Sequence, residues 1–498
     1  MGLITETRKA IQDAPKGMFN AYVLMCTCVF AFAGVAKGFD EGNIASLVTQ
    51  PHFKAKFGID HLSEDDYANT KGWIVSITTA GAVFGCLGCP RINDRFGRRW
   101  TFRLSTLIYI AGILGQGLCN GNLSGLYASR FIAGLGLGVL TIVPPIYISE
   151  IAPKTIRGLL TLQHAACQQL GVVFGFFINY GVTKSYPGGE KQWMLPTLLQ
   201  LLPATIWLAG SFLCCESPRW LLYKGKRHEA ATNLVKLRHL PLDHPIIVAE
   251  LAGMDAQLLL ETESSGANAI TQYSPTIFGY LGISGDESTF LATGIYGVVK
   301  FASTLAFALF IVDFIGRRRS LITGISLQIV TLVYVGAYLG ATKDMTSAQI
   351  SNTPSASRAS TAAIVAIYIH AVAWSIGWFG IPYLIGSEIF PIRIRSLNVS
   401  ISMAFHWAFY FGCSRAMPSL LAATHRWGAF LFFGCICVIG LVYVFFAMPD
   451  TTGRSLEALD SLFQRPWYTV YRVAYPSSEA VRVEREDAKL GVEHVERA

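Results

Sequence analysis

Two carboxylates interrupt the first long apolar run of the sequence. Asp40 and Glu41 stand within 20–48, a stretch long enough to cross a hydrocarbon core of about 30 Å. A charged group inside a membrane is costly, so its presence there indicates a function. Burial favours the neutral acid and a nearby cation favours the carboxylate, so a change of access or partner can make such a group bind and release a proton. We expect Asp40 to be this group, and Glu41 to point toward an outer vestibule.

Arg130, inside the fourth apolar run, is the natural partner of Asp40. We predict that the two side chains lie within salt-bridge distance, or are bridged by one water, in at least one state. Two plainer interpretations stay open: a static ion pair, or an Asp40 that sits in water at the outer end of its helix.

The composition is that of an integral membrane protein. Of the 498 residues, 52% are hydrophobic and only 14% are charged, against roughly 25% charged in soluble proteins. The mean hydropathy is +0.42, and apolar runs of about 20 residues, the length of a membrane span, recur along the chain. We predict an all-α membrane protein embedded in the lipid bilayer.

The net charge of +8 does not indicate a nucleic-acid partner, because the basic residues cluster in every second loop between apolar runs. Lysine and arginine are enriched in this way in the cytoplasmic loops of membrane proteins. We therefore expect both termini in the cytosol. The first 19 residues are polar, so the first span is expected to act as the insertion signal.

About twelve spans are predicted, in two groups of six. The predicted domains are a cytosolic N-terminus (1–19), an N-terminal six-helix bundle (20–219), a polar cytosolic linker (220–265), a C-terminal helix bundle (266–449) and a charged cytosolic tail (450–498). The spans are 20–48, 74–90, 103–119, 124–149, 160–182, 195–215, 266–283, 290–312, 320–340, 361–389, 398–422 and 427–447.

Two motifs recur in the same order, once in each half. The first motif contains an acidic residue, a glycine and paired arginines, and it follows the second and eighth spans. The second motif is a glutamate seven residues before an arginine, and it follows the fourth and tenth spans. Such a repeat is typical of two parallel six-helix halves with a site between them near the midplane. We expect the two loops at the same face. The motifs are Asp94–Arg99 and Asp313–Arg318, and the pairs Glu150 with Arg157 and Glu388 with Arg395.

Further motifs make an ordered set: Arg130-x3-Gly134-x-Gly136-x-Gly138, Pro145-x-Tyr147-x-Ser149-Glu150, Glu216–Leu221, Ser387–Arg395 and Pro449–Arg454. Over about 20–463 the chain resembles the sugar porter family of the major facilitator superfamily, in its fungal branch. The resemblance implies a major facilitator fold with two pseudo-repeated six-helix bundles. It also implies secondary active uptake of a monosaccharide, or of a related polyol or cyclic acid, by alternating access. Coupling to protons is implied because family members with Asp at the position of Asp40 and Arg at that of Arg130 are proton symporters.

The resemblance places six side chains around the solute: Gln169, Asn268, Tyr273, Tyr383, His406 and Trp407. Amides and phenols can bond to a polyhydroxylated solute, and aromatic faces can cover its C–H surface. Tyr383 and His406 replace the Trp and Asn of glucose-type members, so hexose specificity is not transferred. Helix packing stays an alternative for each residue. His406 with Arg415 could instead hold the carboxylate of an acid such as quinate, although Arg415 is also placed like a snorkelling cation.

By resemblance, charged residues at the cytosolic helix ends form ion pairs that hold the outward-facing state and break when the inner gate opens. Such pairs have two discrete arrangements, which a rocker-switch movement requires. The alternative is that the charges only set the inside-positive topology. The residues are Arg98, Glu150 and Arg157 in the first half, and Arg317, Glu388 and Arg395 in the second.

The sequence has no nucleotide-binding loop, metal cluster or nucleophile–base set, so we expect no enzyme activity, no cofactor and no metal. Cys86 and Cys89 form a CxxC, but on a predicted membrane helix, where small packing residues are the better interpretation. We expect a monomer in the plasma membrane, with a small solute and a proton as its partners. The alternatives are a nutrient sensor, disfavoured by the short tail 450–498, and a transport-deficient truncated isoform.

The start of the seventh span departs from the family pattern. The polar segment Glu261–Ser265 runs directly into Gly266, where the family has an apolar segment with paired glutamines. The remaining 266–283 is short for a bilayer crossing of about 20 residues. We interpret this as a skipped exon or an altered gene model. In the alternative, 246–260 completes the helix and carries Glu250 and Asp255 toward lipid, at several kcal/mol each.

Insertion of an apolar, glutamine-containing half-span before Gly266 is expected to raise both surface expression and uptake. The insertion would cover exposed packing faces and restore buried hydrogen bonds worth about 1 kcal/mol each. Cell-surface labelling and radiolabelled uptake in a transporter-null cell compare the two chains. If the unmodified chain expresses and transports as well as the repaired one, the truncation hypothesis is wrong.

Overall fold

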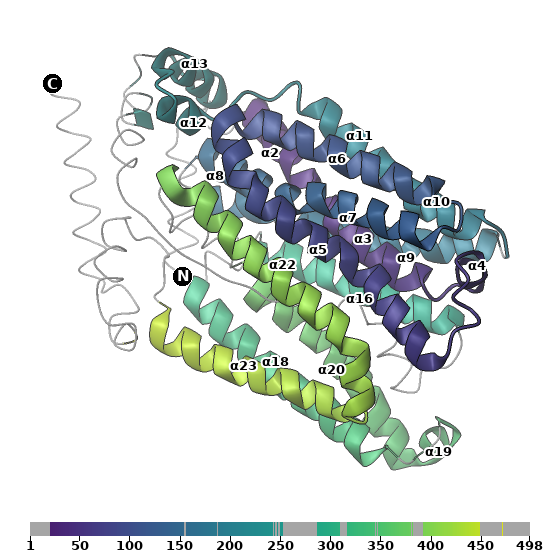
Figure 1. Cartoon of the computed structure of the whole chain (residues 1–498). Coiled ribbons are helices and arrows are strands. Elements are labelled where there is room, and N and C mark those ends of the chain that lie inside the picture. The colour runs from purple at the N-terminus through teal and green to yellow at the C-terminus, as the bar shows by residue number, and fades with distance from the viewer. Residues whose placement is uncertain are drawn as a thin grey trace.

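The regular elements in the described part of the chain are helices (Figure 1). The computed structural model describes residues 20–153, 156–186, 188–242, 286–308, 316–343, 347–379 and 392–448, with the single residues 244, 247, 250, 251, 345, 381 and 471. The described residues therefore exclude the whole of the predicted seventh span (266–283), with Asn268 and Tyr273. They also exclude most of the segment 246–260, which completes that span in the alternative interpretation.

The first half of the chain contains α2 (Ala21–Phe32), α3 (Gly34–Leu47), α4 (Pro51–Lys56), α5 (Glu64–Phe96), α6 (Arg98–Leu118), α7 (Leu123–Leu140), α8 (Val143–Ile151), α9 (Arg157–Ser185), α10 (Lys191–Leu199), α11 (Leu201–Gly210), α12 (Pro218–Tyr223) and α13 (Arg227–Arg238). The second half contains α16 (Asp286–Ala306), α18 (Arg317–Ala341), α19 (Ser347–Asn352), α20 (Pro354–Trp374), the π-helical turn η4 (Ser375–Phe379), α22 (Ile392–Ala423) and α23 (Trp427–Ala447).

Eight helical segments of the described chain are long and apolar enough to cross a membrane. They coincide with eight of the predicted spans, and α6, α16 and α22 lie where the third, eighth and eleventh spans are predicted. Arginines in the first two turns of α6 lower its mean hydropathy. Large apolar side chains such as Phe84, Leu118 and Phe409 stay exposed, as membrane-facing side chains do. The protein is a multi-pass membrane protein.

Local sequence explains where several helices begin. Ser63 caps α5 by accepting the N–H of Asp66 at 3.2 Å, and the acidic first turn of that helix suits its positive end. Asn122 caps α7 through the N–H of Gly125 at 3.1 Å. Ser217 caps α12, with Pro218 as the first helical residue.

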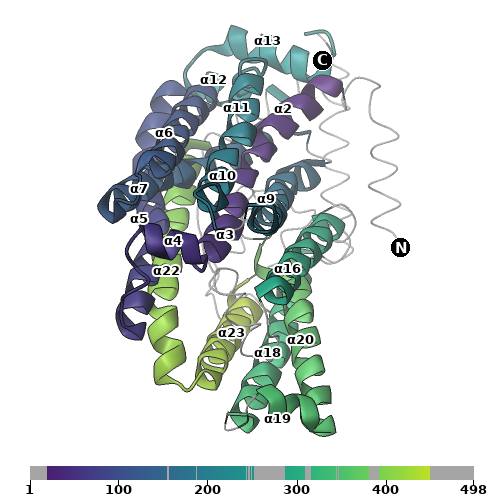
Figure 2. The same cartoon turned by 90° about the vertical axis from the view of Figure 1, so that its right-hand side faces the viewer.

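The helices form two groups, α2–α13 and α16–α23, which meet along two lines. α22 of the second group lies beside α5 of the first, and α16 lies against α9 (Figures 1 and 2). A continuous buried apolar core joins the two groups, with Phe30 and Tyr147 on one side and Trp407 on the other. Among the described helices, the two halves therefore meet at α5 with α22 and at α9 with α16.

Glycines bring α3 and α9 into close contact. A Cβ at Gly38 would lie 1.7 Å from the carbonyl oxygen of Gln168, and one at Gly42 would lie 2.6 Å from that of Val172. Small residues that let two backbones approach are typical of membrane helix pairs. Because this face of α3 is committed to α9, the rotation of α3 about its axis is fixed, and with it the direction of every polar side chain on the helix.

The repeated loops have the same backbone. Gly97 precedes α6 with φ 90° and ψ 173°, and Gly316 precedes α18 with φ 89° and ψ 157°. Both helices begin at the end of the molecule where α12 lies, away from α4 and α19 (Figure 1). This confirms the predicted arrangement for the described part of the repeat; residues 313–315 lie outside it.

Gly97→Ala is expected to lower the melting temperature of the purified protein. An alanine there would take a left-handed φ, at a cost of about 1–3 kcal/mol, and its Cβ would lie 2.6 Å from a carboxylate oxygen of Glu216. Gly88→Ala is the matched control, because a Cβ at Gly88 meets nothing within 4 Å and alanine favours a helix. Thermal unfolding in detergent compares the two variants, and equal shifts would contradict strain at Gly97.

Candidate functional site

Asp40 and Arg130 form a bidentate ion pair between α3 and α7. Nη1 and Nη2 of Arg130 donate to the two carboxylate oxygens of Asp40 at 3.0 and 3.2 Å. The arginine also donates to the carbonyl of Ile74 at 2.7 Å and to Gln116 at 3.3 Å. Its side chain is 1% exposed and that of Asp40 9%. The predicted contact is confirmed, and the water-exposed Asp40 of the alternative is excluded in this state.

Lys37 and Glu41 share the face of α3 that meets α22. The ammonium of Lys37 lies 3.9 Å from Glu41, and 5.1 and 5.8 Å from the ring centroids of Trp407 and Tyr410. Glu41 accepts a hydrogen bond from the Tyr410 hydroxyl at 3.0 Å and is 7% exposed. The expectation that Glu41 points into an outer vestibule was wrong, because the glycine contact with α9 turns it toward the second half of the chain.

Several buried polar atoms on α3 and α9 have no hydrogen-bond partner among the described residues. They are Nζ of Lys37, both side-chain polar atoms of Gln168, and Oε1 of Gln169. Lys37 is 2% exposed and the two glutamines 1%. Buried polar groups are nearly always hydrogen-bonded in proteins, so these atoms are candidates for contact with a polar ligand.

α22 contributes aromatic side chains from the second half. Trp407 is 1% exposed, and its indole N–H donates to Oγ1 of Thr141 at 3.2 Å across the interface. His406 is buried and packs edge-on against Trp407, with ring centroids 5.7 Å apart. Two predicted solute-site residues therefore stand beside Lys37 and Glu41, and Gln169 lies on α9.

Lys300 on α16 brings a second buried ammonium to the interface between the halves. It is 1% exposed and lies 3.7 Å from the centroid of the Trp374 ring and 5.6 Å from that of Tyr296. Sequence reasoning missed Lys300 and Lys37, although a lone lysine in an apolar run is the same signal that singled out Asp40.

Other predicted site residues fall elsewhere. Tyr383, like Asn268 and Tyr273, lies outside the described residues. Arg415 hydrogen-bonds to Asn69 and lies 5.2 Å from the centroid of the Trp73 ring, near the start of α5. This contact occupies its guanidinium at the α4 end of the molecule, so the structure does not support a carboxylate clamp made by His406 and Arg415.

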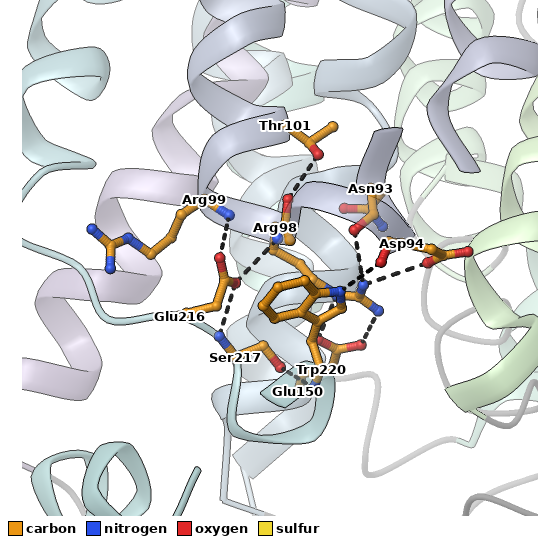
Figure 3. A network of polar contacts seen from close by, with 10 residues as sticks. Asn93, Asp94, Arg98, Arg99, Thr101, Glu150, Glu216, Ser217 and Trp220 are labelled. Carbon is orange, nitrogen blue, oxygen red and sulfur yellow. Dashed lines mark hydrogen bonds and ion pairs between the residues drawn. The ribbon is translucent and has the colours of Figure 1, made fainter. Parts of the chain in front are cut away.

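A second buried ion pair joins Arg98 and Glu150 at the α12 end (Figure 3). Nε and Nη2 of the arginine donate to the two carboxylate oxygens at 2.9 and 2.8 Å. The glutamate side chain is fully buried and the arginine 2% exposed. Asp94 adds a longer contact to Arg98 at 3.6 Å. The predicted pair is present.

Glu216 extends this network, and sequence reasoning assigned it no role. Its carboxylate accepts the backbone N–H groups of Arg98 at 3.1 Å, Arg99 at 3.2 Å and Ser217 at 2.9 Å (Figure 3). It therefore caps α6, whose first turn has no side-chain cap of its own. Burial raises the pKa of the Glu216 carboxyl, and the amides and arginines around it oppose that rise. The indole of Trp220 donates to the carbonyl of Asp94 at 3.1 Å.

The remaining predicted gate residues are placed only in part. Arg157 is the first residue of α9 and is half-buried, and Arg317 is the first residue of α18 and is buried. Arg395 lies in α22, but its side chain and the whole of Glu388 lie outside the described residues.

Residues 26–463 match the family model described as "Sugar (and other) transporter". The "Probable quinate permease" of Neosartorya fischeri is 32% identical over 499 residues, covering 91% of this chain and 89% of the relative. The quinate permease of Emericella nidulans is 32% identical over 496 residues, covering 91% of both.

Among solved structures, the chain resembles XylE of E. coli, described as an MFS proton:xylose symporter and bound there to 6-bromo-6-deoxy-D-glucose. The TM-score is 0.74 at 21% identity, over 89% of this chain and 99% of that one. The fold is therefore that of the major facilitator superfamily, and the matched proteins are transporters, not enzymes.

Glu150→Gln is expected to destabilise the described conformation by up to about 3–5 kcal/mol, because the buried guanidinium of Arg98 loses its two short bonds to a carboxylate and keeps the longer contact to Asp94 at 3.6 Å. Thermal unfolding and the labelling rate of a cysteine placed at the α12 end measure the effect. Glu229→Gln is the control: its ion pair with Lys226, at 2.7 Å, is exposed and is worth at most about 1 kcal/mol. Similar effects of the two variants would refute a special role for the buried pair.

Proposed function

Because the chain belongs to the family of sugar and other transporters, we propose that it is a secondary active transporter that couples uptake of a small polyhydroxylated solute to protons. The transport mechanism is alternating access of a site between the two halves.

The buried Asp40–Arg130 pair is the observation that carries the proton coupling. In the described state both oxygens of the Asp40 carboxylate accept hydrogen bonds from Arg130. When the halves move and this contact loosens, the cost of an unpaired buried carboxylate favours protonation. Arg130 keeps the carbonyl of Ile74 and the amide of Gln116 as acceptors, so the guanidinium stays solvated by the protein while Asp40 carries a proton.

The solute site in this proposal lies between the two halves. Gln169, His406 and Trp407 line it together with Asn268, Tyr273 and Tyr383. Relatives named for quinate and a structural neighbour named for xylose leave a monosaccharide, a polyol and a cyclic acid as candidates. Hydroxyl groups are common to all three classes, and the unpartnered amides of Gln168 and Gln169 suit them.

The Arg98–Glu150 pair, with Glu216, is proposed to close the cytosolic gate. Its counterpart in the second half is Arg317, Glu388 and Arg395. Breaking a buried pair exposes both charges to water, so the pair has two stable arrangements, closed and solvated, as a gate requires.

The proposed topology places the α12 end in the cytosol, with both termini, the linker 220–265 and the tail 450–498 on that side. The N-terminal bundle is 20–219 and the C-terminal bundle 266–449. We propose a monomer in the plasma membrane, because that is where uptake of a nutrient begins.

Asp40→Asn is expected to abolish proton-driven accumulation while solute binding and exchange persist. In proteoliposomes with the membrane potential held at zero, a gradient of one pH unit can drive about tenfold accumulation by the unmodified protein, and the variant should reach a ratio of about one. Asp60→Asn, at an exposed carboxylate, is the control and should accumulate normally.

Undiminished accumulation by Asp40→Asn would show that Asp40 is not the coupling carboxylate. Binding without any accumulation by the unmodified chain would favour a nutrient sensor. Poor accumulation that the repaired seventh span restores would identify a transport-deficient form.

A further inference from the structure

We propose that Gln116 is a positioning residue of the proton site: its amide oxygen holds the guanidinium of Arg130 when Asp40 is protonated, and so sets the pH at which Asp40 takes up its proton. The inference rests on the proposed function and deepens it, because it names a residue that controls the coupling site. Gln116 stands in the last turn of α6, a helix that carries neither member of the ion pair.

The guanidinium of Arg130 donates to three partners within the described residues. Nη1 and Nη2 bond to the carboxylate of Asp40 at 3.0 and 3.2 Å, and Nε bonds to the backbone carbonyl of Ile74 at 2.7 Å. Nη1 also donates to Oε1 of Gln116 at 3.3 Å. Gln116 is therefore the neutral side chain among these partners, and it shares Nη1 with the carboxylate that is proposed to change its charge.

The hydrogen bonding of the Gln116 amide favours this role over a structural one. The residue is 3% exposed, and its Nε2 has no hydrogen-bond partner within the described part of the chain. A buried amide group without a partner is costly, so packing alone would be served better by an apolar side chain of similar shape. A guanidinium can only donate, so the contact with Arg130 determines that the oxygen, and not the nitrogen, of the amide faces it.

Close packing of α6 on α7 directs Gln116 toward Arg130 (Figure 2). A Cβ at Gly112 would lie 2.3 Å from the backbone nitrogen of Ala133, and one at Gly115 would lie 2.5 Å from the hydroxyl of the residue before Arg130. Small residues that let two backbones approach are typical of membrane helix pairs. They fix the rotation of α6 about its axis, and with it the direction of the Gln116 side chain.

The two protonation states of Asp40 depend on this amide to different degrees. With Asp40 ionised, the guanidinium of Arg130 has a counter-charge, and the amide adds one bond among several. With Asp40 neutral, a positive charge stays buried, and the carbonyl dipoles of Gln116 and Ile74 become its main support. Buried charges are costly unless they are hydrogen-bonded. The amide therefore stabilises the protonated state more than the ionised one, and so raises the pH at which the proton binds.

Titratable groups on the neighbouring helices do not change in the test of this proposal. They are Lys37 and Glu41 on α3, Lys71 on α5, Tyr109 on α6, Tyr127 on α7 and His164 on α9. The lysine and glutamate of α3 face α22, and the hydroxyl of Tyr109 donates to Gln200 at 2.8 Å. Because each group is present in every variant, a difference in proton uptake between variants reports on residue 116.

Infrared spectroscopy of the purified full chain follows the protonation of Asp40 directly and needs no solute. A protonated carboxyl has a C=O band that a carboxylate lacks, and the part of this band that is missing in Asp40→Asn belongs to Asp40. Gln116→Met keeps the length of the side chain and removes the amide. We expect it to lower the midpoint of proton uptake by about one pH unit, as the loss of one hydrogen bond to a charged group implies.

Gln116→Glu makes the opposite change. Two carboxylates then share the guanidinium of Arg130, so one of them takes up a proton at a higher pH than Asp40 does alone. We expect the midpoint to rise by about one pH unit or more. The double variant that combines Asp40→Asn with Gln116→Glu gives the contribution of the new carboxyl itself.

Gln328 on α18 is the matched control. It is also 3% exposed, and its Oε1 has no hydrogen-bond partner among the residues that the structure describes. Gln328→Met and Gln328→Glu should leave the midpoint of Asp40 unchanged. Thermal unfolding separates the proposed role from a structural one, because Gln116→Met should cost no more stability than Gln328→Met.

The proposal is wrong if the midpoints of Gln116→Met and Gln116→Glu equal that of the unmodified chain or shift in the same direction. A loss of stability in Gln116→Met without a shift would overturn it too, as would a Gln116→Glu variant that gains no carboxyl band at any pH at which it stays folded. Opposite shifts, in a chain that accumulates no solute under a pH gradient, would support the role of Gln116 and count against the proposed transport function.

Discussion

The close contact between α3 and α9 is the constraint on which the site depends. Because Gly38 and Gly42 leave no room for a side chain against the backbone of α9, α3 can take only one rotation. That rotation directs Asp40 to Arg130 on α7 and Lys37 and Glu41 to α22. A single larger residue on the glycine face would turn both charged faces away from their partners. The glycines therefore position these charged side chains although they touch none of them.

The same kind of interaction, a buried ion pair between arginine and a carboxylate, occurs at two places in the molecule. Asp40–Arg130 lies inside the first bundle beside the interface, and Arg98–Glu150 lies at the α12 end, where Glu216 also caps α6. Each pair is bidentate, so each holds its helices in a defined register and is costly to break halfway. Interactions of this kind favour two discrete states over a continuum, which is the property that alternating access requires.

The sequence predicted the contacts of charged side chains that lie inside apolar runs. A charge in an apolar run has few possible partners, so the contacts of Asp40 with Arg130 and of Arg98 with Glu150 followed from residue type and order. The direction of the Glu41 side chain could not be predicted from the sequence. Successive side chains on a helix point about 100° apart, and only the packing of α3 against α9 determines which direction residue 41 takes. The role of Glu216 was missed because its partners are backbone amides, which carry no sequence signal. Lys37 and Lys300 were visible as charges in apolar runs, but the aromatic rings that they face depend on how the helices pack.

The Asp40–Arg130 pair offers a physical reason for the proposed coupling. Protonation of Asp40 would leave Arg130 without the charge of this partner, so the guanidinium would depend on its other acceptors, the carbonyl of Ile74 and the amide of Gln116. If the solute binds the protonated state more tightly, then by linkage the proton favours the solute to the same degree. Couplings of this kind are typically about 1–3 kcal/mol, enough to make the doubly loaded state the main form that crosses.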